Sequence, residues 1–299
     1  MQVSRHPNFA TETIVEHAPA KVNLALHVTG RRADGYHLLD TLVVFTEAGD
    51  RVHVRPAAKD GFAVSGPFAA GVPADGANLV LMARDLLRGI AGGRAFPVAI
   101  ELEKNLPVAS GIGGGSSDAA ATLRALSLLW GLSLSPETLA GAALPLGADL
   151  PMCLAGQTLV ARGIGEALAP VRGLPRLAMV LVNPGVAVAT PSVFRALASR
   201  DSPPLPPLPA RPDFAAFAAW LASARNDLET PAAAITPELA PALAALRDTG
   251  AALARMSGSG ATCFGLYPHH EDAARAAVAI AAARPSWYVE ATQTLETGP

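Results

Sequence analysis

Hydrophobic and polar residues alternate along much of the first hundred positions, which predicts a series of β-strands. The runs are rich in β-branched and aromatic residues, and Gly, Pro and Asp separate them as turn residues do. One stretch has a different period. From Asn78 to residue 90, apolar residues recur at spacings of three and four, which predicts a helix with Asn78 as its N-cap. The strands are predicted at 13–17, 21–30, 38–48, 51–57, 62–66 and 96–105.

The rest of the chain mixes both patterns and predicts an α+β fold. Helices are predicted at 116–130, from Ser135 onward, from Thr190 onward, and at 213–224, 236–250 and 269–283. Strands are predicted at 157–163, 176–185, 186–189, 251–260, 262–267 and 287–293. Because strands precede helices in both halves, we expect two lobes, 1–165 and 166–299, with a ligand site in the cleft between them. Residues 202–212 contain six prolines and predict a semi-rigid surface loop.

The charge balance, hydrophobicity and cysteine content limit the binding partners and the compartment that we expect for this protein. The 299 residues carry 23 Lys and Arg against 25 Asp and Glu, without a basic run, so nucleic acid is not expected as the main partner. Hydrophobic residues make up 51% of the chain, but polar residues interrupt them well before the roughly 20 residues that a membrane span needs. The two cysteines lie far apart and no apolar leader segment is visible, which favours the reducing cytoplasm. The sequence leaves the oligomeric state open.

The strongest local motif is the glycine-rich segment 107–126, PVASGIGGGSSDAAATLRAL, between a predicted strand and a predicted helix. Its small residues let the backbone approach a ligand and present N–H groups to an anion at the positive end of a helix dipole. The alternative is a plain connecting turn. The segment has no GxxxxGK[ST] pattern, it departs from GxGxxG at Ser116, and the chain lacks the HRD and DFG markers of protein kinases. The motif therefore predicts phosphate binding of another type.

Two charged residues lie among apolar neighbours. Lys21, one of only three lysines, lies inside a predicted strand. Its compact ammonium suits a phosphate or a neighbouring carboxylate. The alternative is a lysine on an edge strand whose side chain reaches solvent. Asp149, in LGADLPMCLAG, requires a cation or hydrogen bonds. Its carboxylate can act as a base toward a hydroxyl, or it can cap a helix. Both residues are candidates for catalysis.

Two turns are further candidates for ligand binding. Tyr36 and His37 follow an Asp-Gly pair, which places an aromatic ring and an imidazole on a turn. Residues 256–267, MSGSGATCFGLY, predict two strands joined by an SGSG turn. This turn either closes over a ligand or forms an ordinary hairpin.

These candidates lie in four segments, 18–41, 107–126, 146–156 and 256–267, which in this order resemble the kinase superfamily of galactokinase, homoserine kinase, mevalonate kinase and phosphomevalonate kinase. The loop of that superfamily usually reads PxxxGLGSSAA, and residues 107–120 here read PVASGIGGGSSDAA. The extra glycine and the DGYH turn resemble one family within it, the 4-diphosphocytidyl-2-C-methyl-D-erythritol kinases. The resemblance covers about residues 18–267 and implies a two-lobed GHMP-kinase fold with the active site in the cleft between the lobes.

The resemblance also implies an activity: phosphorylation of the 2-hydroxyl of 4-diphosphocytidyl-2-C-methyl-D-erythritol by ATP with Mg²⁺, in the non-mevalonate route to isoprenoid precursors. Asp149 would take the hydroxyl proton, while Lys21 would hold that base ionised and stabilise charge on the γ-phosphoryl group. The residues implied to bind the substrate are Asn23, Tyr36, His37, Thr190 and Phe194. Those implied to bind ATP are Asn78, Lys104, Pro107, Val108, Ala109, Ser110, Gly111, Ile112, Gly113, Gly114, Gly115, Ser116 and Ser117.

Some alternatives stay open at this point. The chain could be another small-molecule kinase of the superfamily, acting on homoserine or mevalonate. A non-catalytic nucleotide sensor is a second class, against which the presence of both Lys21 and Asp149 argues. An RNA-binding module is a third, against which the net charge of −2 and the 5% aromatic content argue. No cluster of carboxylates in the sequence identifies ligands for Mg²⁺.

Overall fold

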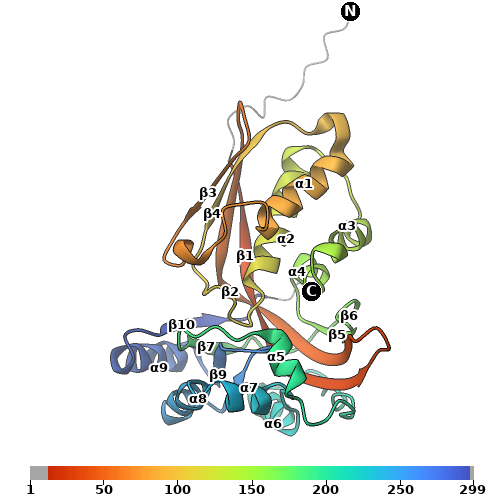
Figure 1. The fold of residues 1–299 in the computed structure, drawn as a ribbon. Helices are drawn as coiled ribbons and strands as arrows, with labels where there is room; N and C mark the ends of the chain where they lie inside the picture. Colours follow the sequence, from red (N-terminus) through yellow and green to blue (C-terminus); the bar gives the residue numbers. More distant parts are fainter. Residues whose placement is uncertain (1–12, 297–299) are drawn as a thin grey trace, which may run out of the picture.

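The computed structural model describes residues 13–296, which form two β-sheets; the first extends from the upper part of Figure 1 into the lower part, where the second lies. The first sheet has the order β3-β4-β2-β5-β6 with β1 paired to β2, and the second has the order β10-β7-β9-β8. The first contains β1 (Ile14–Arg31), β2 (His37–Pro56), β3 (Gly61–Ser65), β4 (Val98–Glu103), β5 (Leu159–Gly163) and β6 (Ala167–Pro170). The second contains β7 (Ala178–Asn183), β8 (Leu253–Met256), β9 (Cys263–Tyr267) and β10 (Tyr288–Gln293).

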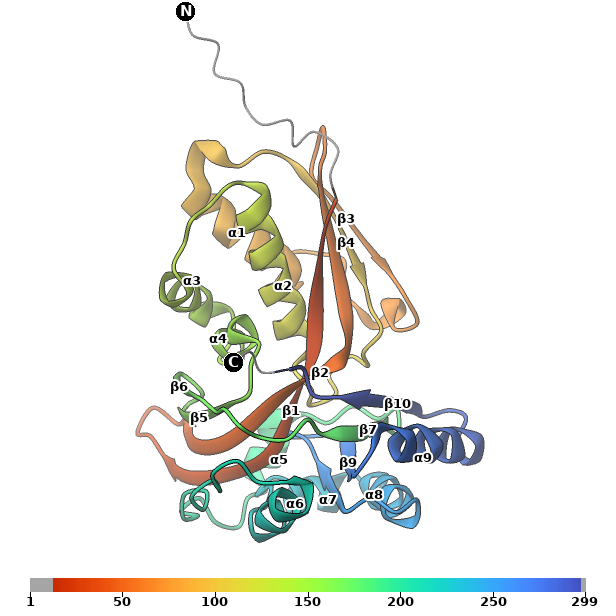
Figure 2. The same ribbon diagram turned by 180° about the vertical axis from the view of Figure 1, so that it is seen from behind.

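Strands β1 and β2 form one long antiparallel hairpin that runs through both parts of the molecule (Figures 1 and 2). They have 18 and 20 residues. The prediction of two separate strands at 13–17 and 21–30 is wrong, because Pro19 does not end the strand. The pairing shifts register between Pro19 and Lys21, and such an irregularity accommodates a residue that lacks an N–H. Lys21 therefore lies in the middle of a continuous ribbon.

Four helices lie on the same side of the first sheet (Figure 2). They are α1 (Leu79–Ala91), α2 (Gly114–Leu129), α3 (Pro136–Ala143) and α4 (Leu150–Ala155). The predicted cap of α1 is confirmed, because the side chain of Asn78 accepts from the Val80 N–H. The helix predicted from Ser135 onward is also capped, since the Ser135 side chain accepts from the Thr138 N–H. Helix α2 is buried along most of its length, since its three consecutive alanines at 119–121 let it approach the sheet closely. This packing fixes the position of its N-terminal end.

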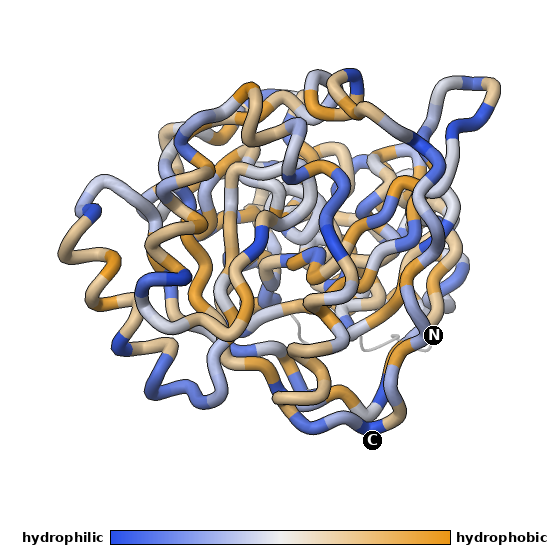
Figure 3. The backbone as a smooth tube through the Cα atoms, turned by 90° about the horizontal axis from the view of Figure 1, so that it is seen from below, coloured by the Kyte–Doolittle hydropathy of each residue, from blue (hydrophilic) through white to orange (hydrophobic). Residues whose placement is uncertain are grey.

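Five helices cover the second sheet and the hairpin end in the lower part. They are α5 (Thr190–Arg195), α6 (Phe214–Ser223), α7 (Glu229–Ile235), α8 (Leu239–Asp248) and α9 (His270–Ala283). Short 3₁₀ segments lie at Ala69–Gly71, Gly92–Arg94 and Leu144–Leu146. Strands β7 and β9 are fully buried and supply the centre of the lower core. Strongly hydrophilic residues occupy many of the outer loops (Figure 3).

Apart from the strands of the long hairpin, which were predicted in separate pieces, the sequence-based predictions are confirmed for most elements and wrong for one. The predicted helices at 116–130, 213–224, 236–250 and 269–283 are present within a few residues of those bounds. The predicted strand at 186–189 is absent. Gly185, with a φ of +81°, turns the chain away after β7, whose two edges are already paired with β9 and β10. Helix α7 and strand β6 were not predicted.

The proline-rich segment 202–212 forms neither helix nor strand, as predicted. Hydrogen bonds attach it to the hairpin: the Ser202 N–H donates to the Val28 carbonyl, and the Leu205 N–H donates to the Asp40 carboxylate. The segment is thus fixed along the lower half of β1 and β2. The division of the chain into lobes at residue 165 stays a prediction; β6, which follows this point, still pairs with β5 of the first sheet.

Candidate active site

Lys21 and Asp149 form an ion pair at the junction of the two parts. The Lys21 Nζ donates to the Asp149 Oδ2 at 2.7 Å. The lysine side chain is 6% exposed and the aspartate side chain 41%. Asp149 precedes α4, but its side chain does not cap that helix. The carboxylate therefore keeps an open side toward solvent, as a base that receives a proton requires.

The glycine-rich loop lines a cavity of about 400 Å³ next to this pair. Gly111 and Gly113 have φ values of +78° and +65°, which side-chain-bearing residues adopt only at a cost. Gly113 is the N-cap of α2, so the first N–H groups of that helix begin at the loop. The cavity therefore combines free backbone donors with the positive end of a helix dipole, an arrangement that suits phosphate.

A buried charge network forms the back of this cavity. The Lys104 ammonium contacts Asp50 at 2.5 Å and Asp118 at 2.7 Å, and all three side chains are at most 4% exposed. Burial by itself would lower the pKa of Lys104, but the two carboxylates outweigh it and raise that pKa. Burial raises the pKa of Asp118 well above its ordinary value, and the Asp50 carboxylate adds to this rise while Lys104 opposes it. The network fixes the loop to the sheet, because the Asp50 carboxylate also accepts from the Leu106 N–H.

A second cavity, of about 700 Å³, lies on the other side of Asp149. The His37 ring stacks on Phe194 with centroids 4.6 Å apart. The Nε2 atom of His37 is buried and has no hydrogen-bond partner among the described residues. Burial, followed by the positive charges of Arg31 and Arg200, lowers the pKa of His37, so its imidazole is neutral at pH 7. Tyr36 lines the same cavity and is 58% exposed.

Asp149 and Thr190 line both cavities, so the ion pair stands where the two spaces meet. The Thr190 hydroxyl is hydrogen-bonded to the Ser259 hydroxyl at 2.7 Å. Ser259 belongs to the SGSG turn, and Ser257 of the same turn donates to the Gly111 carbonyl at 3.1 Å. The turn thus packs against the glycine-rich loop and braces it, a role that an ordinary hairpin does not have.

Most of the residues predicted to bind ATP line the smaller cavity, including Asn78 and Lys104. Ile112 and Ser117 do not: Ile112 is fully buried, and the Ser117 hydroxyl donates to the Pro19 carbonyl. Asn23 lines neither cavity, and its side chain donates to Thr41 at 2.8 Å. Asp118 and its contact with Lys104 were not predicted, although Asp118 lies in the glycine-rich segment 107–126.

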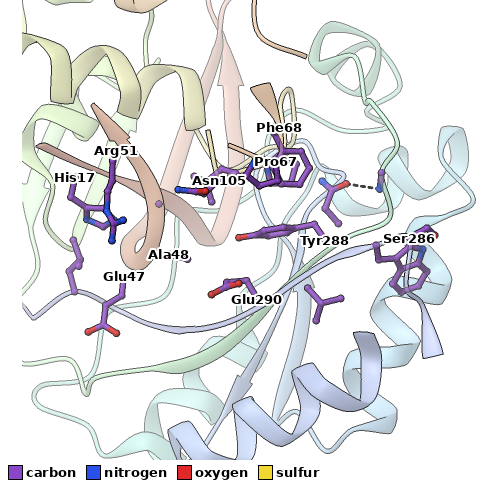
Figure 4. A pocket seen from close by; sticks show the side chains of 18 residues that line it. His17, Glu47, Ala48, Arg51, Pro67, Phe68, Asn105, Ser286, Tyr288 and Glu290 are labelled. Carbon is purple, nitrogen blue, oxygen red and sulfur yellow. Dashed lines mark hydrogen bonds between the residues drawn. The ribbon is translucent and has the colours of Figure 1, made fainter. Parts of the chain in front are cut away.

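A third cavity, of about 920 Å³, is larger and separate from the ion pair (Figure 4). His17, Glu47 and Arg51 of the hairpin face Tyr288 and Glu290 of β10 across it. Among the residues of the other two cavities, only Pro107 also lines this one. It contains neither Lys21 nor Asp149, so size alone does not identify the active site.

The chain matches two family models, the GHMP kinases N terminal domain at residues 78–157 and GHMP kinases C terminal at residues 207–285. A relative from Rhizobium etli named 4-diphosphocytidyl-2-C-methyl-D-erythritol kinase is 54% identical over 285 residues, 95% of this chain and 96% of the relative. A relative of the same name from Brucella melitensis is 58% identical and covers 93% and 94%. The chain belongs to the 4-diphosphocytidyl-2-C-methyl-D-erythritol kinase family.

Solved structures agree with this family. A crystal structure of 4-(cytidine 5'-diphospho)-2C-methyl-D-erythritol kinase has a TM-score of 0.77 and 37% identity, and the match covers 95% of this chain and 100% of that one. Homoserine kinase from Cytophaga hutchinsonii has a TM-score of 0.67 at 20% identity, with 98% and 97% covered, and shows the shared fold alone. The predicted GHMP-kinase fold is confirmed. No helix within residues 13–296 is long and apolar enough to cross a membrane.

Proposed function

We propose that the protein transfers the γ-phosphoryl group of ATP to the 2-hydroxyl of 4-diphosphocytidyl-2-C-methyl-D-erythritol, in the non-mevalonate route to isoprenoid precursors. The observation that carries this proposal is the position of Asp149 between two cavities. It lines the cavity formed by the glycine-rich loop, here the glycine-rich cavity, and the cavity that contains Tyr36, His37 and Phe194, here the aromatic cavity. A nucleotide in the first and an acceptor in the second would meet at its carboxylate. Family membership supplies the identity of the acceptor.

The chemistry requires positioning more than covalent participation. Asp149 accepts the proton of the acceptor hydroxyl as that oxygen attacks phosphorus. Lys21, held 2.7 Å from the carboxylate, fixes its orientation and supplies positive charge where the transferred group carries negative charge. Because the ammonium is buried, water screens its field little.

The glycine-rich backbone would hold the phosphates of ATP. Its N–H groups at the start of α2 replace the lysine of a GxxxxGK[ST] loop as the source of positive potential. Asn78 and Lys104 have structural roles, as a helix cap and as an ion-pair partner, and each also lines the cavity. We assign both residues to the lining of the nucleotide-binding site.

The described residues also fit a magnesium ion brought in with ATP. Mg²⁺ usually takes one or two protein oxygens, and phosphates and water supply the rest. No group of three or more His, Cys, Asp and Glu within residues 13–296 could hold a metal by itself. Asp118 lines the glycine-rich cavity and has a buried Oδ1 to which no described residue is hydrogen-bonded, and Ser116 lines the same cavity. These two would hold the ion, which supplies neutralising charge to the phosphates.

The aromatic cavity would read the cytosine. His37 offers a neutral imidazole nitrogen without a partner, which suits a hydrogen bond to the edge of a base. Tyr36 and Phe194 offer ring faces for stacking. Thr190 stands next to Asp149 in both cavities and is placed to contact the sugar alcohol. Asn23 lines neither cavity and remains a proposed substrate contact; its buried Oδ1 has no hydrogen-bond partner within residues 13–296.

A coupled assay of ADP release, with and without the cytidyl diphosphate acceptor, tests the proposal. We expect release that depends on this acceptor and on Mg²⁺, with a phosphorylated acceptor as product. Homoserine and mevalonate in the same assay test the alternative kinases of the superfamily. Preferred phosphorylation of either would overturn the proposed acceptor, and binding of ATP without turnover on any acceptor would favour a sensor. We place the enzyme in the cytoplasm with small molecules as its partners.

A further inference from the structure

Arg124 connects three elements around the ion pair through one guanidinium group. Its Nε donates to the Glu16 carboxylate at 2.8 Å, its Nη2 to the His17 carbonyl at 2.9 Å, and its Nη1 to the Cys153 carbonyl at 3.3 Å. Arg124 belongs to α2, Glu16 and His17 to β1, and Cys153 to α4. A single side chain therefore joins the helix of the glycine-rich loop to the strand that carries the lysine of the ion pair and to the helix that follows its aspartate.

On β1, Arg124 uses a strand edge that needs hydrogen-bond donors. Within residues 13–296, β1 pairs here with β2 alone, so the carbonyls of its other edge require partners from elsewhere. Two side chains of α2 supply them: Arg124 donates to His17, and the Ser117 hydroxyl donates to the Pro19 carbonyl at 2.8 Å. Positions 117 and 124 are seven residues apart and therefore lie on one face of the helix. The helix is thus fixed along β1 up to two residues before Lys21.

On α4, Arg124 contacts the last turn of the helix. The Cys153 N–H donates to the Asp149 carbonyl at 3.0 Å, but the Cys153 carbonyl lies too near the helix end to have an N–H of the helix as its partner. Among the described residues, Arg124 supplies its hydrogen bond. The Asp149 side chain has Lys21 as its one hydrogen-bond partner within residues 13–296. The place of this carboxylate therefore depends on where α4 is held.

We infer that Arg124 is a positioning residue for phosphoryl transfer, because it holds α4 against β1 at the spacing that keeps Asp149 on Lys21. This inference rests on the proposed function, in which Asp149 is the base. Arg124 lines neither the glycine-rich cavity nor the aromatic cavity, so its influence on the reaction passes through the elements that it joins. A misplacement of roughly 1 Å can cost about 10²-fold in rate. Loss of the guanidinium should therefore slow the chemical step and spare the binding of both substrates.

Steady-state kinetics of Arg124→Gln, with ATP and the acceptor varied in turn, test this role. We expect kcat to fall by about tenfold to a hundredfold, with both KM values within about twofold of the parent. Arg124→Lys keeps the charge but offers one nitrogen for three acceptors, so it should recover only part of kcat. Glu16→Gln removes the ion pair and leaves both carbonyl contacts, so its kcat should stay near that of the parent. Arg88→Gln, which removes a comparably exposed pair with a carboxylate on α1, is the matched control and should change neither constant.

A double-mutant cycle with Asp149→Asn separates positioning from stability. If Arg124 acts through the base, Arg124→Gln should lower the residual rate much less in the Asp149→Asn background than in the parent. Arg124→Lys is taken through the same cycle and remains measurable where Arg124→Gln does not fold. Equal factors in the two backgrounds, an unchanged kcat in Arg124→Gln, or an equal loss of kcat in Glu16→Gln would overturn the inference.

Crystal structures of the parent and of Arg124→Gln supply a readout that needs no turnover. We expect the Lys21 Nζ and the Asp149 Oδ2 to separate beyond hydrogen-bond distance in the variant, and a pair that stays at 2.7 Å would contradict the inference. Absence of turnover by the parent enzyme on the acceptor would instead overturn the proposed function. The comparison of the two structures would then still decide whether Arg124 holds the pair together.

Discussion

The Lys21 ammonium lies 2.7 Å from the Asp149 carboxylate, although the two residues are 128 positions apart in the sequence. The two side chains are buried to different extents. The cation is enclosed at 6% exposure, whereas the carboxylate remains 41% exposed and borders both cavities. The lysine is therefore fixed in place and the aspartate is accessible. This asymmetry suits a base that must receive a substrate while a neighbouring charge holds it in one orientation.

Replacing Asp149 with Asn should abolish phosphoryl transfer while ATP binding persists. The amide keeps the shape of the side chain but cannot accept the hydroxyl proton, and loss of a general base typically costs about 10²- to 10⁴-fold in rate. Single-turnover kinetics and calorimetry with ATP would measure the two effects. Glu137→Gln, at an exposed helix N-terminus, is the control for loss of one negative charge. Near-native turnover by well-folded Asp149→Asn would remove this residue from the role of base.

Gly113→Val should weaken ATP binding and lower turnover. Gly113 has a φ of +65°, and a Cβ there would lie 3.1 Å from the Cβ of Lys21, so the new side chain strains the loop and displaces the Lys21 side chain. Gly131→Val is a matched control: its φ is +61°, but nothing lies within 4 Å of a Cβ at that position. Calorimetry should show reduced ATP affinity for the first variant only. Equal losses in both would assign the effect to stability.

Tyr36→Ala should raise the KM for the cytidyl acceptor and leave the KM for ATP nearly unchanged. A base stacked on an aromatic ring gains about 1–3 kcal/mol, and Tyr36 lines only the aromatic cavity of the two at the ion pair. Steady-state kinetics with each substrate varied in turn would separate the two constants. Trp287→Ala removes an aromatic ring from the third cavity and should change neither. Equal effects of Tyr36→Ala on both constants would contradict separate sites.

Lys104→Met should destabilise the fold by about 3–5 kcal/mol, because it leaves the buried carboxylates of Asp50 and Asp118 without their cation. Urea denaturation would measure the change in the free energy of unfolding. Adding Asp118→Asn to the same chain removes one of the two like charges and should recover part of the loss. If Lys104→Met unfolded at the parent midpoint but lost ATP affinity, Lys104 would serve the nucleotide rather than the fold.

Local sequence signals predicted the parts of the structure that depend on near neighbours. The cap of α1 at Asn78 is an example, because the side chain bonds to the backbone only two residues away. The glycine-rich loop was also recognisable, since its conformation requires glycine at particular positions. Pairing between distant strands was less accessible: the long hairpin was predicted as separate strands because Pro19 is a strand breaker unless a register shift accommodates it.

The site itself depends on contacts that no local pattern encodes. Lys104 and Asp50 are 54 residues apart, and the antiparallel pairing of β2 with β4, with Arg51 opposite Glu103, brings them together. Likewise, the resemblance implied that the backbone as far as Ser117 binds ATP, but only the fold shows that the Ser117 hydroxyl donates to the Pro19 carbonyl. The residue types were therefore visible in the sequence, but the direction in which each side chain points required the fold.

The β1–β2 hairpin carries Lys21, which holds Asp149, and at its far end the turn with Tyr36 and His37. Both belong to one paired ribbon, so the hairpin backbone sets how far the proposed base-binding turn lies from the ion pair. We therefore expect the enzyme to favour acceptors long enough to place a hydroxyl at Asp149 while the base contacts the turn. A short alcohol would reach only one of these two places.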